Sequence, residues 1–237
     1  TNMKHLCLVI GLLFVIGTIN AQTSFANISF DGPERYTPKT KVKTAAEFRA
    51  MKDRIRAFPS RLDYRYDYLN ELSNSEDWNR LTDEVVALVS FSYDTQHRWI
   101  WNNQFDAIGD DAEAFLLSSV QDYVLMLYMT NDVANYNLIN RISDAVLEDN
   151  PGHRDFLTYP AMTSAAVGNY EKALIYLHKA ENLHREDGTV AILLGDNYMQ
   201  LKNTNLALSY YKKAVRYGSE SEVIAAKKAI EKIEDTE

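Results

Sequence analysis

Histidine, cysteine and carboxylate side chains are the residues of this 237-residue chain that could perform chemistry. A zinc site usually places two histidines or thiolates a few residues apart, so that one short segment supplies two ligands. No such spacing links the histidines that follow residue 21, which are His97, His153, His178 and His184. The one cysteine, Cys7, lies in an apolar segment at the N-terminus. We therefore expect no metal, no cofactor and no disulfide bond.

Two adjacent carboxylates, Asp110 and Asp111, follow Gly109 and form the other arrangement that could bind a metal. Acidic residues are much commoner at the start of a helix as charges that oppose the positive end of its dipole. The chain also lacks a glycine-rich phosphate loop and a Gly-x-Ser-x-Gly motif. These observations predict a protein without a catalytic site.

Three aromatic residues, Trp99, Trp101 and Phe105, lie close together in the segment 91–105. Aromatic rings stack on sugars and anchor interfaces, so this segment could bind a glycan or another small ligand. Aromatic side chains more often fill the space between elements, and here they would pack between N-terminal helices and the rest of the fold. Both interpretations stay open at this point.

The charge of the chain argues against binding to nucleic acid. The formal net charge is −8, whereas contacts to phosphates need a basic surface. The basic residues Arg49, Lys52, Arg54 and Arg56 are interrupted by Asp53, which indicates a solvated helix face.

The N-terminal residues 1–21 have the layout of a secretory signal peptide. Lys4 supplies the positive charge, an apolar run extends over 14 residues from Leu6 to Ile19, and Ala21 precedes the expected cleavage site. That run is shorter than the about 20 residues that span a bilayer, and no later segment is suitable. We therefore expect an exported protein, periplasmic or secreted, with no stable membrane span after cleavage. Residues 22–43 are rich in proline, glycine and small polar residues, which predicts an extended lead-in.

From Thr44 onward, apolar residues recur at helical spacing and strand-like alternation is scarce. The pattern predicts an N-terminal helical region over 44–119, with its first helix ending before Pro59. It also predicts a long helix from about Asp110 to Thr130. The region 44–119 shows no visible repeat, so it is either a set of diverged repeats or a separate helical bundle.

The chain from residue 120 to 221 carries a 34-residue period. Small and aromatic residues recur at this spacing in the pairs Tyr136 and Tyr170, Ala161 and Gly195, Ala173 and Ala207, Tyr176 and Tyr210, and Ala180 and Ala214. The repeating units are 120–153, 154–187 and 188–221. Two antiparallel helices approach closely only where one of them offers a small side chain, so Ala161/Gly195 and Ala173/Ala207 are the expected contact points.

The last unit resembles the tetratricopeptide repeat (TPR) family, whose pattern is Trp-x2-Leu-Gly-x2-Tyr followed by Ala-x3-Phe and a later Ala and Pro. The matching residues are Leu194, Gly195, Tyr198, Ala207, Tyr211 and Ala214. Ala191 replaces the tryptophan and Ser219 the proline. In the middle unit, Gly168 to Ala173 resembles the turn between paired helices, whereas Pro160 must lie in the first turn of its helix or kink that helix. The first unit is degenerate.

The resemblance implies an all-α solenoid of helix-turn-helix repeats. In the family, the first helix of each unit lines a concave face that receives an extended peptide or a partner helix. On this chain the corresponding residues are Gln121, Val124, Tyr128, Asp155, Thr158, Met162, Thr189, Ile192, Asp196 and Met199. No lysine is among them, so the family's lysine-dependent clamp for a C-terminal carboxylate is not implied. Ile192 and Met199 either anchor a partner or belong to the core.

A helix over 222–237 is expected to close the array. Ser219 and Glu222 have the spacing of a capping box, and Val223, Ala226, Ile230 and Ile233 form one apolar stripe. Taken together, the sequence favours an exported, non-catalytic scaffold that binds a protein or peptide of unknown identity. The alternative is a glycan- or small-ligand-binding protein that uses Trp99, Trp101 and Phe105.

Overall fold

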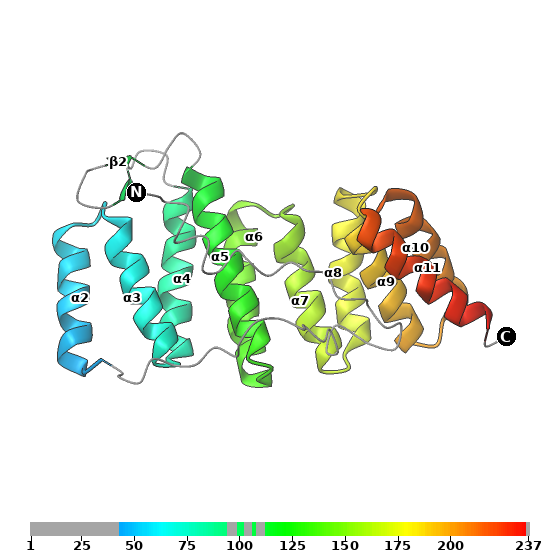
Figure 1. Ribbon diagram of the computed structural model, residues 1–237, viewed down its shortest axis with the longest axis horizontal. Coiled ribbons are helices and arrows are strands. Elements are labelled where there is room, and N and C mark those ends of the chain that lie inside the picture. Colours follow the sequence, from blue (N-terminus) through cyan, green and yellow to red (C-terminus); the bar gives the residue numbers. More distant parts are fainter. Residues whose placement is uncertain (1–42, 94–98, 102–105, 108–111, 236–237) are drawn as a thin grey trace. The chain divides into compact units, whose positions relative to one another are not determined.

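The structure is a computed structural model that describes residues 43–93, 99–101, 106–107 and 112–235 (Figure 1). These residues form ten α-helices and a two-stranded antiparallel ribbon. The elements are α2 (Ala45–Ala57), α3 (Leu62–Asn74), α4 (Trp78–Ser92), β1 (Ile100–Trp101), β2 (Asp106–Ala107), α5 (Ala112–Met129), α6 (Val133–Asp149), α7 (Arg154–Ala166), α8 (Tyr170–Leu183), α9 (Gly188–Gln200), α10 (Thr204–Tyr217) and α11 (Glu220–Glu234). The prediction of an all-α helical repeat array is confirmed.

The chain divides into two compact units between Asp149 and Asn150. The N-terminal unit contains α2 to α6 and the ribbon, and the C-terminal unit contains α7 to α11. Residues 1–21 and nearly all of 22–43 lie outside the described residues, as do Asp110 and Asp111. The predicted signal peptide and lead-in therefore stay predictions.

The first helical hairpin of the C-terminal unit turns where the sequence predicts, and the second turns 34 residues later. α7 and α8 are joined at Gly168 and Asn169, and α9 and α10 at Lys202 and Asn203. In both turns the first residue is left-handed, with φ of 78° at Gly168 and 58° at Lys202. The asparagine that follows caps the next helix by accepting a hydrogen bond from a backbone N–H three residues later.

The N-terminal unit contains two hairpins that turn in a similar way. Glu76 (φ 55°) precedes the N-cap Asp77 between α3 and α4, and Asn131 (φ 52°) precedes Asp132 between α5 and α6. Asp132 accepts a hydrogen bond from the Ala134 backbone N–H, two residues later. The left-handed residue followed by an Asx residue thus recurs in both units.

The α3–α4 turn also has the hydrogen bond that closes the C-terminal hairpins. The Asp77 backbone N–H donates to the Leu72 carbonyl at 3.0 Å, as Asn203 donates to Tyr198 at 2.8 Å. The spacing from Asp77 to Asp132 is 55 residues rather than 34, and the interval includes the segment with β1 and β2. The two interpretations of 44–119, diverged repeats or a separate helical bundle, both stay predictions.

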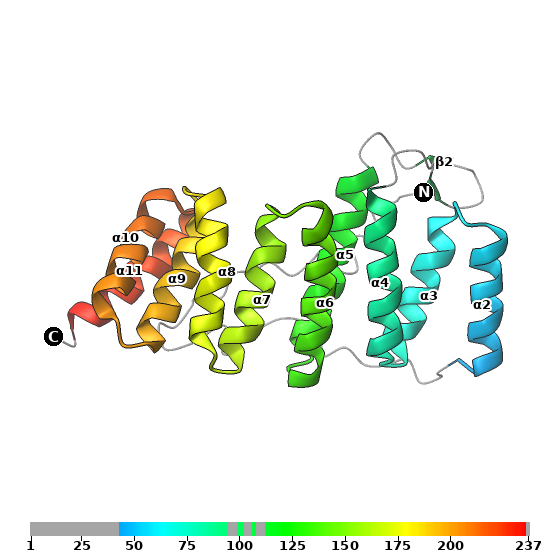
Figure 2. The same cartoon turned by 180° about the vertical axis from the view of Figure 1, so that it is seen from behind.

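Small residues bring the helices of the C-terminal unit together, as the 34-residue pattern predicts. Ala161, Ala173 and Ala207 are buried, with exposed fractions of 1% or less. A Cβ atom on Gly195 would lie 2.6 Å from the ring of Tyr211, so α9 and α10 can pack as they do only with glycine at this position. Figure 2 shows α11 beside α9 and α10, and α11 packs against both of these helices.

Two sequence predictions concern single helices of this unit. α7 begins at Arg154, so Pro160 lies inside the helix. Of the two predicted alternatives, the placement in the first turn is excluded and a kink of the helix stays a prediction. Thr163 and Ser164 both donate side-chain hydrogen bonds to the carbonyl of Pro160. The capping box of α11 is confirmed, and none of the described helices has both the length and the apolar character needed to cross a membrane.

Candidate functional site

The predicted partner-binding residues of α9 lie on one side of that helix, because their spacings of three and four residues match the helical period. α9 starts at a well-formed cap, in which the Asp187 carboxylate accepts a hydrogen bond from the Val190 backbone N–H at 2.9 Å. We refer to Thr189, Ile192, Asp196 and Met199 as the α9 face.

Two residues of the α9 face already contact other side chains of the C-terminal unit. Ile192 is only 6% exposed and belongs to a core cluster with Tyr211 of α10 and Ile233 of α11. The hydroxyl of Thr189 donates a hydrogen bond to Glu222, in the first turn of α11. Ile192 is therefore a core residue, because the terminal helix covers this part of α9.

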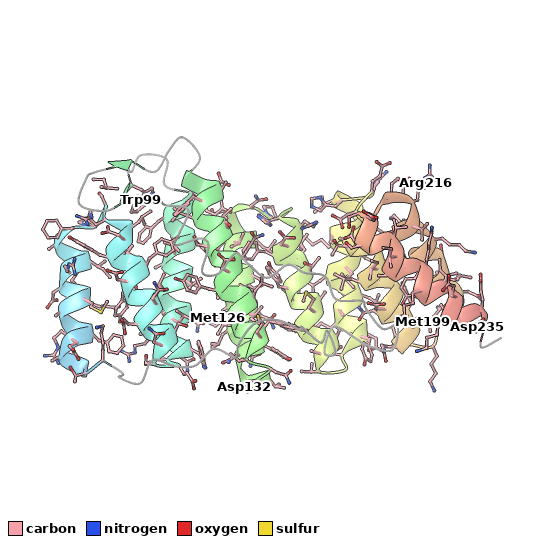
Figure 3. All side chains as sticks on the ribbon, viewed as in Figure 1. Trp99, Met126, Asp132, Met199, Arg216 and Asp235 are labelled. Atoms are coloured by element: carbon pink, nitrogen blue, oxygen red, sulfur yellow. The ribbon has the colours of Figure 1, made fainter. Side chains whose placement is uncertain are left out.

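The other two residues of the α9 face are partly exposed. Met199 packs against the edge of the same core cluster, together with Ile230 of α11, near the end of α9 (Figure 3). Asp196 accepts a hydrogen bond of 2.7 Å from the hydroxyl of Tyr211. Within the described part of the chain, no basic side chain forms an ion pair with Asp196. The α9 face therefore exposes part of a carboxylate and part of a methionine side chain.

Burial disfavours the charged form of Asp196 and raises the pKa of its carboxyl to about 7, although the Tyr211 hydroxyl acts in the opposite direction. Burial also raises the pKa of Tyr211, and the nearby Asp196 adds to that effect. Tyr211 is held in place because its ring lies directly over Gly195. The pattern of small residues thus positions the hydroxyl that contacts the carboxylate.

The predicted binding residues of α7 lie in a different environment. Thr158 is buried and donates to the carbonyl of Asp155, whereas Met162 is partly exposed. Asp155 forms an ion pair with Arg154, and Arg154 also reaches Asp187 at 3.2 Å. The charge of Asp155 is therefore compensated within the unit, in contrast to that of Asp196.

The predicted binding residues of the N-terminal unit are mostly used in packing. Val124 is fully buried, and Gln121 is partly exposed. The ring of Tyr128 stacks on Tyr136 with 5.7 Å between centroids, and burial raises the pKa of Tyr128 to about 12. Gln121, Val124 and Tyr128 belong to the N-terminal unit, whereas the α9 face belongs to the C-terminal unit.

The aromatic segment contributes at least one residue to the core. Trp99, labelled in Figure 3, is 3% exposed, and its ring lies 5.2 Å from that of Phe91. The backbone of Trp101 lies in β1, but its side chain and all of Phe105 are outside the described residues. The packing interpretation therefore holds for Trp99.

One polar cluster was not predicted from the sequence. Glu181 of α8 accepts hydrogen bonds from Lys213 at 2.7 Å and from the Tyr210 hydroxyl at 3.1 Å, and it contacts the ring of His178 at 3.1 Å. The other ring nitrogen of His178 lies 2.8 Å from the hydroxyl of Tyr198. Burial raises the pKa of Glu181, but the hydrogen bonds from Lys213, His178 and Tyr210 outweigh it and hold the pKa below its usual range.

This cluster joins three helices, α8, α9 and α10, through residues that are 3 to 32 positions apart in the sequence. No local motif signals such a set, which explains why the sequence did not reveal it. Among the described residues, no group of three or more histidine, cysteine, aspartate or glutamate side chains could hold a metal ion.

A hollow of about 540 Å³ in the N-terminal unit is lined by basic and aromatic residues of α2, α3 and α4, among them Arg49. Most of its cations have an acidic neighbour: Lys52 pairs with Glu84, and Arg80 with Asp77. The basic residues of α2 thus form the largely solvated and compensated helix face that the sequence indicates.

Comparison with known proteins gives little beyond this geometry. No protein-family model matches the chain, and no curated protein matches it. A solved structure of a thermophilic TPR protein from Thermus thermophilus is similar to the chain, with 15% sequence identity and a TM-score of 0.45. The similarity covers 78% of this chain and 88% of that chain. At this level, no residue role is transferred from that protein.

Proposed function

We propose that the chain is an exported, non-catalytic scaffold that binds a protein or peptide partner through the C-terminal unit. The partner contacts the exposed part of the α9 face, which is formed by Asp196 and Met199. A repeat array suits this role because its stacked helices present a continuous surface that accepts extended peptides or helices.

The observation that carries this proposal is the incomplete burial of Asp196 and Met199 beside an otherwise closed core. Methionine adapts its shape to different apolar partners, since its side chain is unbranched and polarizable. The neighbouring Ile192 and Tyr211 are fixed in the core, so the exposed pair stands on a rigid support. Rigid supports favour binding because little conformational entropy is lost.

Export is the second part of the proposal, and it is supported by the layout of residues 1–21. Export places the scaffold in the periplasm or outside the cell, where it would assist the assembly or stability of an envelope or secreted complex. The mass of the native protein should correspond to a chain that begins at Gln22. A native protein that retains Leu6–Ile19 would exclude this form of export.

Glycan or small-ligand binding through the aromatic segment has less support, because Trp99 packs on Phe91 rather than facing solvent. A ligand that stacked on Trp99 would quench its fluorescence. Capture of a peptide by α9 should leave that fluorescence unchanged.

Site-specific photo-crosslinking tests the binding surface. A photo-reactive amino acid is placed at Gln200, which is exposed at the end of α9, and in a matched variant at Lys212, which is exposed on α10. We expect a defined adduct from Gln200 in the native compartment and a much weaker one from Lys212. Equal labelling from both positions, or none from Gln200, would refute α9 as the binding surface.

A further inference from the structure

Asp196 differs from the other partly buried carboxylates of the C-terminal unit in what surrounds it. Glu181 receives hydrogen bonds from Lys213 and Tyr210 and also contacts His178. Asp155 pairs with Arg154. Among the described residues, the Asp196 side chain accepts one hydrogen bond, from the neutral hydroxyl of Tyr211. A carboxylate removed from water without a cation is unfavourable, and an incoming cation relieves that cost.

The repeat register shows that the acidic group is specific to this unit. The residue 34 positions before Asp196 is Met162, and the residue 34 positions after it is Ile230. Met162 and Ile230 are both apolar and partly exposed. Ile230 and Met199 pack against one core cluster formed by α9, α10 and α11. Met199 and Ile230 thus belong to one apolar cluster, and Met199 lies one helical turn after Asp196 on α9.

We propose that Asp196 binds one lysine or arginine side chain of a partner peptide whose neighbouring residues are apolar, with Met199 and Ile230 as the apolar contacts. This inference rests on the proposed function and specifies the chemistry of the partner. A single carboxylate between apolar side chains fits one cation flanked by apolar residues, and it repels an acidic segment. The Tyr211 hydroxyl holds one carboxylate oxygen, and the incoming donor would bind the other.

A metal ion is a poorer match for this position than a basic side chain. Calcium takes six to eight oxygen ligands, and magnesium requires nearly ideal octahedral geometry. Asp196 is one carboxylate, and the core cluster beside it consists of alanine, isoleucine and tyrosine. An ammonium or guanidinium group needs a single carboxylate and brings its own apolar stem, which can lie along Met199.

Two synthetic peptide libraries test the proposal. Both have random apolar residues around one central position, which is lysine in the first library and the uncharged norleucine in the second. Binding of each library to the mature full chain is measured by fluorescence polarisation. We expect the wild type to bind the lysine library about tenfold more tightly, since a charge-assisted hydrogen bond in a partly buried site has this effect.

Two matched variants identify the carboxylate. Asp196→Asn should remove the preference for lysine while it retains binding to the norleucine library. Glu231→Gln removes one exposed carboxylate on α11 and should keep the preference. Circular dichroism and thermal melting of Asp196→Asn show whether it is folded, and its retained norleucine binding is a second check.

A calorimetric measurement separates direct pairing from a general charge effect. Binding of the lysine peptides should lower the pKa of Asp196, so protons are released near pH 6.5. The number of protons released follows from the binding heats measured in buffers of different ionisation enthalpy. Asp196→Asn should release none. Equal binding of both libraries by the wild type would overturn the inference and leave the proposed function intact. Failure of both libraries to bind would overturn the proposed function as well.

Discussion

The two units close their hairpins with a similar turn but fill their cores with side chains of different size. In the N-terminal unit, the large side chains that are almost completely buried are Leu62, Tyr68, Leu69, Leu72, Leu81, Leu88, Leu116, Leu127, Ile139 and Ile142. In the C-terminal unit Phe156, Leu157, Leu177 and Leu194 belong to this class, and nine alanines are buried as well. No alanine whose burial is described in the N-terminal unit is buried.

The difference teaches that the turn and the core of a helical hairpin can diverge independently. A turn is fixed by backbone conformation and capping, which many residue types satisfy. A core must match in volume across facing helices, so a change on one helix requires a change on its neighbour. The two units share a type of turn and differ in the side chains that fill their cores.

The largest effect on stability is expected when a buried side chain in the core of the N-terminal unit is shortened. Leu81→Ala removes a fully buried side chain of α4 and leaves a cavity, which should lower the free energy of unfolding by about 2–5 kcal/mol. Met129→Ala changes a side chain that is 63% exposed and should cost less than about 0.5 kcal/mol. Denaturant unfolding of the two variants gives the comparison. Similar losses would mean that Leu81 is not part of a packed core.

The reciprocal change in the C-terminal unit should also destabilise, by a smaller amount. Ala207→Leu inserts a large side chain where α10 has a fully buried alanine, and we expect a loss of about 1–3 kcal/mol from overpacking. Ser209→Leu adds similar volume at an exposed position of the same helix and serves as the control. If Ala207→Leu were neutral, the assignment of Ala207 as a close helix contact would be wrong.

The sequence predicted the C-terminal unit better because alanine and glycine at fixed spacing are a readable signal. Ala161, Ala173 and Gly195 were identified from spacing alone, and all three lie where helices meet. The left-handed conformation of Glu76 was not recognised, because glutamate carries no preference for it. The buried leucines of the N-terminal unit would suit any helical bundle, so they do not indicate a repeat.

The candidate site was only partly predictable for a different reason. Helical spacing correctly grouped Ile192, Asp196 and Met199 on one side of α9. It could not show that α11 folds back over Ile192, since that contact joins residues far apart in the sequence. The hydrogen bond from Tyr211 to Asp196 also joins two helices, and no pattern within one helix reveals it.

The C-terminal unit should make stability depend on pH, because the pKa of Asp196 is raised from 3.8 to about 7. The folded state then holds a proton more tightly than the unfolded state. The stabilising effect is complete below pH 3.8 and is lost as the pH rises through about 7.

We expect Asp196→Asn to be more stable than the wild type at pH 8, by about 1–2 kcal/mol, since water still reaches part of the residue. At pH 4 the two proteins should be nearly equal. Thermal melting at both pH values measures this, and Glu231→Gln controls for the loss of one charge. A difference that is the same at both pH values would contradict the assignment to Asp196.

The smallest effect concerns the turn that the two units share. Glu76 and Lys202 have positive φ, a conformation that costs an ordinary residue about 1 kcal/mol and glycine almost nothing. Replacement by glycine removes this strain, but it also gives the unfolded chain more freedom, which offsets part of the gain. Glu76→Gly and Lys202→Gly should each stabilise the protein by a few tenths of a kcal/mol, up to about 0.5 kcal/mol.

Gly168→Ala should destabilise the protein by about 1 kcal/mol through backbone strain alone, because a Cβ atom at Gly168 has nothing within 4 Å. Chemical denaturation of the three variants measures whether each is more or less stable than the wild type. If Lys202→Gly stabilised the protein and Glu76→Gly destabilised it, the two turns would not be equivalent, and the N-terminal unit would be a separate helical bundle rather than a set of diverged repeats.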